Sequence, residues 1–215
     1  MSSPSPKYEF TGGTRVEFGI TLKRIRASMS FGGVVKGEVG GWIEKDANLD
    51  QHGNAWVSDN ARVSDNARVS DNARVSGNAR VSDNARVSGN ARVSGDAWVS
   101  GNAWVSGDAL VYGNAWVSGD ALVYGNARVS GDALVYGNAR VSGDAWVSDN
   151  ANISIIYGRG YTLTAHVDKK IKVRFNVGCF SGSRKEFAAR AKQEGIKPKA
   201  IKAVFALVDA TVEKS

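Results

Sequence analysis

A six-residue repeat between residues 54 and 154 limits what this chain can fold into more than any other feature. Valine recurs every six residues from Val57 to Val147, and Ile153 continues the row. Alanine recurs two residues before each of them, from Ala55 to Ala151. The unit, Val-Ser-(Gly/Asp)-(Asn/Asp)-Ala-(Arg/Trp/Leu), appears about seventeen times. A repeat this regular is typical of proteins built from stacked copies of one small element.

Each unit predicts a short strand followed by a corner. In residues 61–64, Ala-Arg-Val-Ser, small apolar and larger side chains alternate, which is the period-two pattern of a strand. Ala and Val would face one side, and Arg, Trp or Leu would face the other side together with Ser or Tyr. The next two residues, such as Gly101 and Asn102, tolerate the backbone of a sharp turn. Such a unit cannot bury its apolar side alone, so we expect the copies to coil and stack.

This unit resembles the hexapeptide repeat of left-handed parallel β-helices, best known from bacterial acyltransferases. In that family an aliphatic residue and the small residue two places before it point inward, as Val57 and Ala55 would here. Three hexapeptides form one triangular coil in the family. The Ser after each Val departs mildly from the usual Gly, Ala or acidic residue. The resemblance implies a mainly β fold, a left-handed parallel β-helix of nearly six coils, but little about function, because one fold serves many functions.

The segment before the regular repeats has a different pattern. Residues 7–11 and 15–25 alternate in part like strands, and two Gly-Gly pairs follow them. Ala47 begins an imperfect first hexapeptide, and the eight residues from Ala47 to Ala55 predict a two-residue bulge around His52. We expect this segment to cover the end of the β-helix, as solenoids require.

A second resemblance concerns the same segment. The sequences LKRIRA and GGWIEKDANL, followed by GNAWVSDNARV, resemble uncharacterised repeat proteins of bacteria, phages and prophages, some of which carry acyltransferase or polymer-forming labels. This implies a setting, the bacterial cytoplasm during phage infection, and no mechanism. The lone Cys179 agrees with a reducing compartment, because it has no disulfide partner within the chain. We expect no signal peptide, because the N-terminal residues have neither a charged start nor an apolar block. We expect no membrane span, because no apolar run reaches ~20 residues.

The C-terminal segment is basic and no longer repeats. The net charge of the 215-residue chain is +7, and residues 155–215 contain 13 basic and 5 acidic residues. Three strands are expected within residues 155–177, a first helix after the capping pair Ser183 and Glu186, and a second helix from Pro198. The chain therefore divides into an N-terminal β cap (1–46), a hexapeptide-repeat β-helix (47–154) and a basic α+β C-terminal domain (155–215).

Outward positions three hexapeptides apart would stack on one face of the shaft. Six consecutive hexapeptides carry Arg there, from Arg62 to Arg92, so the lower shaft would be ringed with positive charge. We expect aspartates of the neighbouring corners, from Asp59 to Asp83, to offset this charge in a solvated, mutually paired surface. Such exposed pairs contribute little stability.

The upper shaft replaces most of these arginines with aromatic and aliphatic residues. We predict that they form a contiguous outward belt that serves as a protein interface, because monomers rarely leave such a patch exposed and because Trp and Tyr are favoured interface anchors. The expected interface consists of Trp98, Trp104, Leu110, Tyr112, Trp116, Leu122, Tyr124, Leu134, Tyr136 and Trp146. Three partners could cover the belt: the C-terminal segment folding back, a second copy of the chain, or a host or phage protein. We expect a homo-oligomer first, a trimer by analogy with the family or else a dimer.

The basic C-terminal domain supports an alternative function, the binding of nucleic acid or of an acidic partner. The candidate positions are Lys170, Lys172, Arg174, Arg184, Lys185, Arg190, Lys192, Lys197, Lys199 and Lys202. No aromatic run is interleaved with them as single-strand platforms require, and no recognition helix is evident. We therefore rank this function below protein binding.

The sequence offers few groups for catalysis. The acyltransferases that resemble the shaft use a His base at a cleft between subunits, and the two histidines here, His52 and His166, lie outside the regular coils. His52 in the bulge is the candidate base for an acyltransferase-like enzyme, which remains a third hypothesis. Cys179 lacks a local His signature, and no metal-ligand spacing or phosphate loop appears. We therefore expect a non-catalytic scaffold without cofactor or metal that binds a protein, in a phage setting a host factor.

Overall fold

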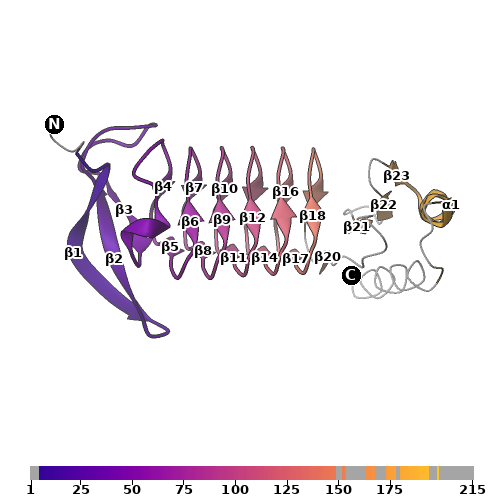
Figure 1. Cartoon of the computed structure of the whole chain (residues 1–215), viewed down its shortest axis with the longest axis horizontal. Coiled ribbons are helices and arrows are strands. Elements are labelled where there is room, and N and C mark those ends of the chain that lie inside the picture. Colours follow the sequence, from indigo (N-terminus) through magenta and orange to yellow (C-terminus); the bar gives the residue numbers. More distant parts are fainter. Residues whose placement is uncertain are drawn as a thin grey trace.

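A computed structural model of the chain describes residues 5–148, 152–153, 163–167, 173–177, 180–193 and 198. Its centre is a straight shaft in which the repeat winds into coils of three short strands (Figure 1). Each strand pairs in parallel with the strand three hexapeptides away, so the shaft has three flat sheets as walls. The expected mainly β fold, a parallel β-helix with three hexapeptides per coil, is confirmed.

The three walls are named here as faces A, B and C. Face A contains β5 (Arg62–Val63), β8 (Arg80–Val81), β11 (Trp98–Val99), β14 (Trp116–Val117), β17 (Leu134–Val135) and β20 (Asn152–Ile153). Face B contains β4 (Trp56–Val57), β7 (Arg74–Val75), β10 (Arg92–Val93), β13 (Leu110–Val111), β16 (Arg128–Val129) and β19 (Trp146–Val147). Face C contains β6 (Arg68–Val69), β9 (Arg86–Val87), β12 (Trp104–Val105), β15 (Leu122–Val123) and β18 (Arg140–Val141).

The Val and Ala rows form the core of the shaft. Val75 lies opposite Val93 in the next coil, and every repeat Val from Val57 to Val147 is at most 1% exposed. The Ala residues from Ala55 to Ala139 are fully buried. Side chains alternate sides along a strand, so burying Val and Ala necessarily turns the residue between them outward.

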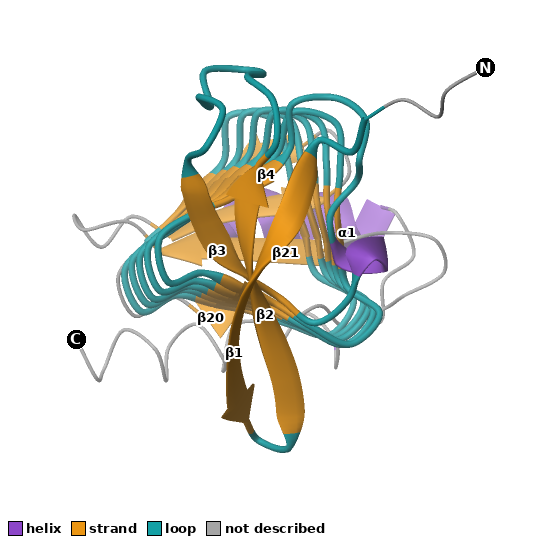
Figure 2. Ribbon diagram, turned by 90° about the vertical axis from the view of Figure 1, so that its left-hand side faces the viewer, coloured by secondary structure: helices purple, strands orange, loops and turns teal. Residues whose placement is uncertain are grey.

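The corners stack through their backbones and side chains. The first corner residue adopts a left-handed backbone, with φ of 67° at Gly77 and 56° at Asp59. The second corner residue forms ladders between coils: Asn54 Nδ2 donates to Asn72 Oδ1 at 2.9 Å, and Asn72 donates to Asn90 at 3.1 Å. Viewed along the shaft, successive corners superimpose (Figure 2). The repeat of three hexapeptides per coil therefore fixes the surface as firmly as the core.

The N-terminal segment closes the lower end of the shaft. Strands β1 (Tyr8–Glu17) and β2 (Ile20–Ala27) form an antiparallel hairpin, and β3 (Val39–Ile43) joins β2 to β5 of face A. The result is one continuous nine-stranded sheet, and the hairpin projects beyond the outline of the coils (Figure 2). The expected strand over residues 15–25 is wrong as a single element, because the chain reverses at Phe18 and Gly19, where φ is positive.

Two glycines let β3 approach the first coil. A Cβ atom at Gly40 would lie 2.6 Å from the Trp56 ring, and one at Gly41 would lie 2.7 Å from the Ala61 carbonyl oxygen. Trp56 is thereby buried, with its ring packed edge-on against Phe31 at 5.5 Å between centroids. This single outward Trp of the lower shaft is therefore core of the cap.

The imperfect first hexapeptide also occurs as expected. The 3-10 helix η1 (Asp46–Asn48) is followed by Leu49, which bridges to Val69 of β6. The buried Asn48 side chain donates to the carbonyl oxygens of Asp65 and Ala67 at 3.1 and 2.9 Å. After Leu49 the chain leaves the coil in a loop that carries the exposed His52.

The C-terminal segment contains a small sheet and a helix. Strand β21 (Leu163–Val167) pairs antiparallel with β22 (Val173–Val177), which pairs with β23 (Phe180–Gly182). Helix α1 (Arg184–Gln193) begins at the expected capping box, where the Ser183 backbone N–H donates to Glu186 Oε2 at 2.8 Å. Strand β23 was not expected. The strand expected at 155–157 lies outside the described residues, as does all of the second helix except residue 198. In the described part of the chain, no helix is long and apolar enough to cross a membrane.

Candidate binding surfaces of the solenoid

The predicted aromatic belt is distributed over all three faces of the shaft. Neighbouring hexapeptides point in different directions, so residues close in sequence lie on different walls. Face A receives Trp98, Trp116, Leu134 and Tyr136; face B receives Leu110, Tyr112 and Trp146; face C receives Trp104, Leu122 and Tyr124. On face B, Arg128 lies between Leu110 and Trp146. The expectation of one contiguous belt is therefore corrected: face A alone carries three such residues at the stacked position in successive coils.

The indole rings lie along the shaft and do not stand away from it. The Nε1 of Trp98 donates to Ser82 Oγ at 3.2 Å, and that of Trp116 donates to Ser100 Oγ at 3.2 Å. In each case the Ser follows the inward Val of the coil below. The two rings stack face to face, with centroids 4.9 Å apart and planes within 3°. This arrangement fixes both rings while leaving Trp98 38% and Trp116 41% exposed.

The hairpin tip extends this aromatic surface below Trp98. Phe18 is 91% exposed at the β1–β2 turn, and Arg80 lies 5.9 Å from the centroid of its ring. Between the hairpin and face A lies a hollow of about 360 Å³. Its walls are Glu17, Phe18, Ile20, Leu22, Arg62, Ser64, Asp65, Arg80, Val81, Ser82 and Trp98. The surface formed by Phe18, this hollow, Trp98, Trp116 and Leu134 is called the face A strip.

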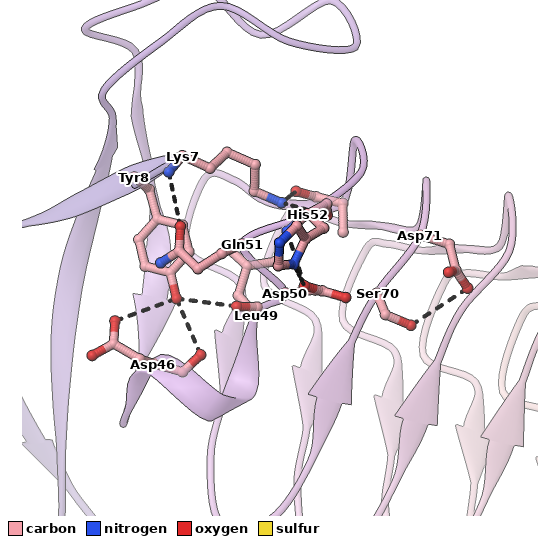
Figure 3. A network of polar contacts seen from close by, with 10 residues as sticks. Lys7, Tyr8, Asp46, Leu49, Asp50, Gln51, His52, Ser70 and Asp71 are labelled. Atoms are coloured by element: carbon pink, nitrogen blue, oxygen red, sulfur yellow. Dashed lines mark hydrogen bonds and ion pairs between the residues drawn. The ribbon is translucent and has the colours of Figure 1, made fainter. Parts of the chain in front are cut away.

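A larger groove lies on face C beside the His52 loop, with a volume of about 620 Å³. It is lined by Asp46, Ala47, Leu49, Asp50, Gln51, His52, Arg68, Val69, Ser70, Asp71, Arg86, Ser88 and Trp104. Side chains of the cap contact the loop that forms one side of this groove (Figure 3). The sequence predicted the bulge but not this groove.

Lys7, directly before β1, and Tyr8, its first residue, anchor that loop (Figure 3). The Lys7 amine donates to the carbonyl oxygens of Ala55 at 3.0 Å and His52 at 3.4 Å, and burial lowers the pKa of Lys7 to about 8. The Tyr8 hydroxyl donates to the Leu49 carbonyl oxygen at 3.1 Å. Burial, followed by the charge of Asp46, raises the pKa of Tyr8 well above its usual range.

His52, the candidate base of the acyltransferase hypothesis, lies on the loop beside the face C groove. Its ring is 91% exposed, and Nδ1 lies 3.3 Å from Asp50 Oδ1. The backbone N–H of His52, with further contacts from its ring, lowers the pKa of the Asp50 carboxyl. His166 lies on β21, and Cys179 lies outside the described residues. Among the described residues, no three His, Cys, Asp or Glu side chains are grouped so that they could hold a metal ion.

The corner aspartates do not form ion pairs with the arginines of the lower shaft. The expected surface of mutually paired Arg and Asp side chains is therefore corrected. Asp59 Oδ2 accepts the backbone N–H of Gly77 in the next coil at 3.0 Å, and Asp71 Oδ2 accepts that of Gly89 at 2.9 Å. In the described structure, no arginine between residues 62 and 92 forms an ion pair with a corner Asp. The carboxylates therefore join the coils, and the arginines are left to other partners.

Half of the predicted basic patch lies in the described C-terminal elements. Arg184, Lys185 and Lys192 are exposed on α1, whose bounds also include Arg190, and Arg174 lies on β22. The positions outside the described residues are Lys170, Lys172, Lys197, Lys199 and Lys202.

Phe18 was not among the surface residues expected from the sequence. Its signal was a Phe-Gly pair, Phe18 and Gly19, inside an otherwise alternating segment, which marks a turn when the following residues alternate again. A large apolar residue at the tip of a hairpin cannot be buried by the hairpin itself, so it is available to a partner.

Comparison with known families supports the architecture. The model of the YdcK beta solenoid repeat matches the chain in overlapping windows that cover residues 55–101, 103–119 and 121–149. The chain is therefore a repeat β-helix protein with repeats similar to those of YdcK. No curated protein matches this chain.

Proposed function

We propose that this chain is a non-catalytic, rigid β-helix scaffold that binds a protein partner through the face A strip. One observation carries the proposal: the stacked Trp98 and Trp116 lie beside an apolar hollow that ends at Phe18. Aromatic side chains in fixed positions are the usual anchors of protein interfaces. The hydrogen bonds to Ser82 and Ser100 already hold the two indole rings in place. Binding a partner therefore costs little additional side-chain entropy.

The partner class is proposed from the shape and chemistry of the strip. Sheets offer a flat surface, and the hollow beneath the hairpin provides a recess of about 360 Å³ for one apolar side chain of a partner. Arg62 and Glu17 form an ion pair of 2.7 Å at its edge, so the rim is polar as interface rims usually are. In the bacterial setting suggested by resemblance, the partner is a host factor that the protein binds or inhibits during phage infection.

A second copy of the chain is the alternative partner for the strip, as the oligomers of the resembling family imply. Self-association as a trimer or dimer would bury the same rings. Light scattering at micromolar concentration distinguishes the two cases, because a monomer leaves the strip for another protein.

The repeat supplies the variants that test the proposal. Arg occupies the position of Trp98 and Trp116 in the lower coils of face A, at Arg62 and Arg80, so Trp98→Arg with Trp116→Arg should fold unchanged. Trp146→Arg on face B is the matched control, since Trp146 is also exposed and bonded to a Ser. We expect the double variant to lose tenfold or more of the captured bacterial partner, measured by quantitative affinity capture. Equal capture by both variants would remove face A from the proposal.

A further inference from the structure

The two lower arginines of each face differ in their partners from one face to another. On face A, Arg62 pairs with Glu17 at 2.7 Å, and Arg80 lies against the ring of Phe18. On face B, Arg74 donates to the carbonyl oxygen of Gly32. The cap therefore provides a partner to three of the four guanidinium groups on these two faces.

On face C the cap leaves both arginines free. Arg68 and Arg86 are exposed and lie directly opposite each other in adjacent coils, about 4.8 Å apart along the shaft. Within the described part of the chain, neither guanidinium has a hydrogen-bond or ion-pair partner. Both line the groove of about 620 Å³, whose size lies within the range of small-molecule sites. Face C thus combines unpaired positive charge with a recess.

The acidic residues of the groove are already engaged by the protein. Asp71 Oδ2 accepts the Gly89 N–H at 2.9 Å, and Asp50 Oδ1 accepts the His52 N–H at 2.9 Å. The Asp46 carboxylate Oδ1 lies 3.5 Å from the Tyr8 hydroxyl, whose single proton is shared between this oxygen and the carbonyl oxygens of Asp46 and Leu49. The three carboxylates repel an anion that merely approaches the groove. A bound anion must therefore contact the guanidinium groups of Arg68 and Arg86 directly.

Trp104 bounds the groove one coil above Arg86. Its Nε1 donates to Ser88 Oγ at 2.9 Å, which holds the ring down over the coil of Arg86. The indole is 45% exposed and therefore available to a planar or apolar part of a ligand. The order along the groove is thus arginine, arginine, indole.

We infer that the face C groove binds a small organic dianion, with one oxyanion group at Arg68, one at Arg86, and an adjoining planar part against Trp104. Guanidinium groups bind both carboxylate and phosphate through paired hydrogen bonds. Two of them at the spacing of the coils fit two such groups within one molecule. The site is separate from the face A strip, so it provides a second ligand surface on the same scaffold.

The test is calorimetric titration of the full chain with three probes: pyrophosphate, glutarate and isophthalate. Pyrophosphate represents the phosphate source, glutarate a flexible dicarboxylate, and isophthalate a planar dicarboxylate. We expect at least one probe to bind with a dissociation constant below about 1 mM, and Arg68→Gln or Arg86→Gln to weaken it about tenfold, as loss of one charged hydrogen-bonded contact predicts. Arg92→Gln is the matched control, because Arg92 is exposed at the same repeat position on face B.

Two further variants test the assigned geometry. Asp71→Asn should strengthen binding, because it removes a negative charge while its amide oxygen still accepts the Gly89 N–H. Trp104→Leu, which copies Leu122 in the coil above, should remove any advantage of isophthalate over glutarate. Unchanged thermal unfolding midpoints would show that the variants are folded. Absence of binding by all three probes, or an equal loss in Arg92→Gln, would overturn the site.

Discussion

A substitution at one corner glycine tests how the coils are joined. Gly77 has a φ of 67°, and a Cβ atom there would lie 3.0 Å from both the N and O atoms of Gly95 in the next coil. Gly77→Ala should therefore lose about 1–2 kcal/mol for the left-handed backbone and somewhat more for the close contact, about 2 kcal/mol of unfolding free energy in total. The Ala methyl group forms no hydrogen bond that would offset this loss.

Gly77→Asp should be less harmful, although it has the same Cβ atom. Asp59, one coil below, already adopts the left-handed conformation and accepts the Gly77 N–H at 3.0 Å. In the described structure, the Gly95 N–H has no protein acceptor. An Asp at position 77 would accept a hydrogen bond from it in the same way. A hydrogen bond to an exposed charged group should return about 1 kcal/mol, so we expect a net loss near 1 kcal/mol.

Urea unfolding followed by circular dichroism gives the two losses, and hydrogen exchange reports the new bond directly. The amide of Gly95 should exchange more slowly in Gly77→Asp than in Gly77→Ala, measured under identical conditions. Asn102→Ala, at a second corner position, serves as a control for loss of a ladder contact without backbone strain. If the Asp variant is no more stable than the Ala variant and the Gly95 amide is unprotected, the carboxylates do not join the coils.

Two other predictions follow from the shaft and its cap. Deleting residues 63–80 removes one coil and should keep Trp98 on the face of the hairpin, whereas deleting residues 63–68 should move Trp98 to another face. Both proteins should show β-type circular dichroism. Only the protein that lacks residues 63–68 should lose partner binding in the capture assay. Equal binding by both would exclude Phe18 from the interface. The folded Lys7 amine has a pKa near 8, and the ordinary lysine value is 10.5, so the unfolded chain binds more protons between these values. The unfolding free energy should therefore rise from pH 8 to pH 10, by about 2 kcal/mol. Urea midpoints should show this rise in the natural chain and not in Lys7→Met; parallel curves for the two would contradict it.

The core and the stacking of the shaft could be predicted because they depend on one quantity, the period of three hexapeptides per coil. Once three hexapeptides form a coil, Val75 must lie under Val93 and Trp98 under Trp116. The same period already placed the belt residues in three rows. The belt residues therefore lie on three walls, because consecutive hexapeptides occupy different walls, and Arg128 separates Leu110 from Trp146 on face B.

The cap and the groove could not be predicted because they depend on contacts between unlike segments. The pairing of Lys7 with the His52 loop joins residues 45 positions apart, and nothing in either segment indicates the other. Arg68 has no partner in the described structure because the hairpin and the loop of Phe31 contact arginines of faces A and B, and the sequence does not indicate where these segments lie. The role of the corner aspartates was missed for another reason: Asp opposite Arg suggests an ion pair, but the nearer donor is the N–H of the coil above.

The closed lower end of the shaft has a consequence for solubility. A parallel β-helix exposes an unpaired strand on each wall at its ends, and such edges recruit other chains into fibres. Here β3 pairs with β5, Leu49 pairs with Val69 of β6, and Trp56 of β4 is covered by Phe31. The outermost strand, β1, is irregular between Phe10 and Thr14 and bears charged residues, so it is a poor template for a further strand. End-to-end polymerisation through this end is therefore blocked by the chain's own N-terminal segment.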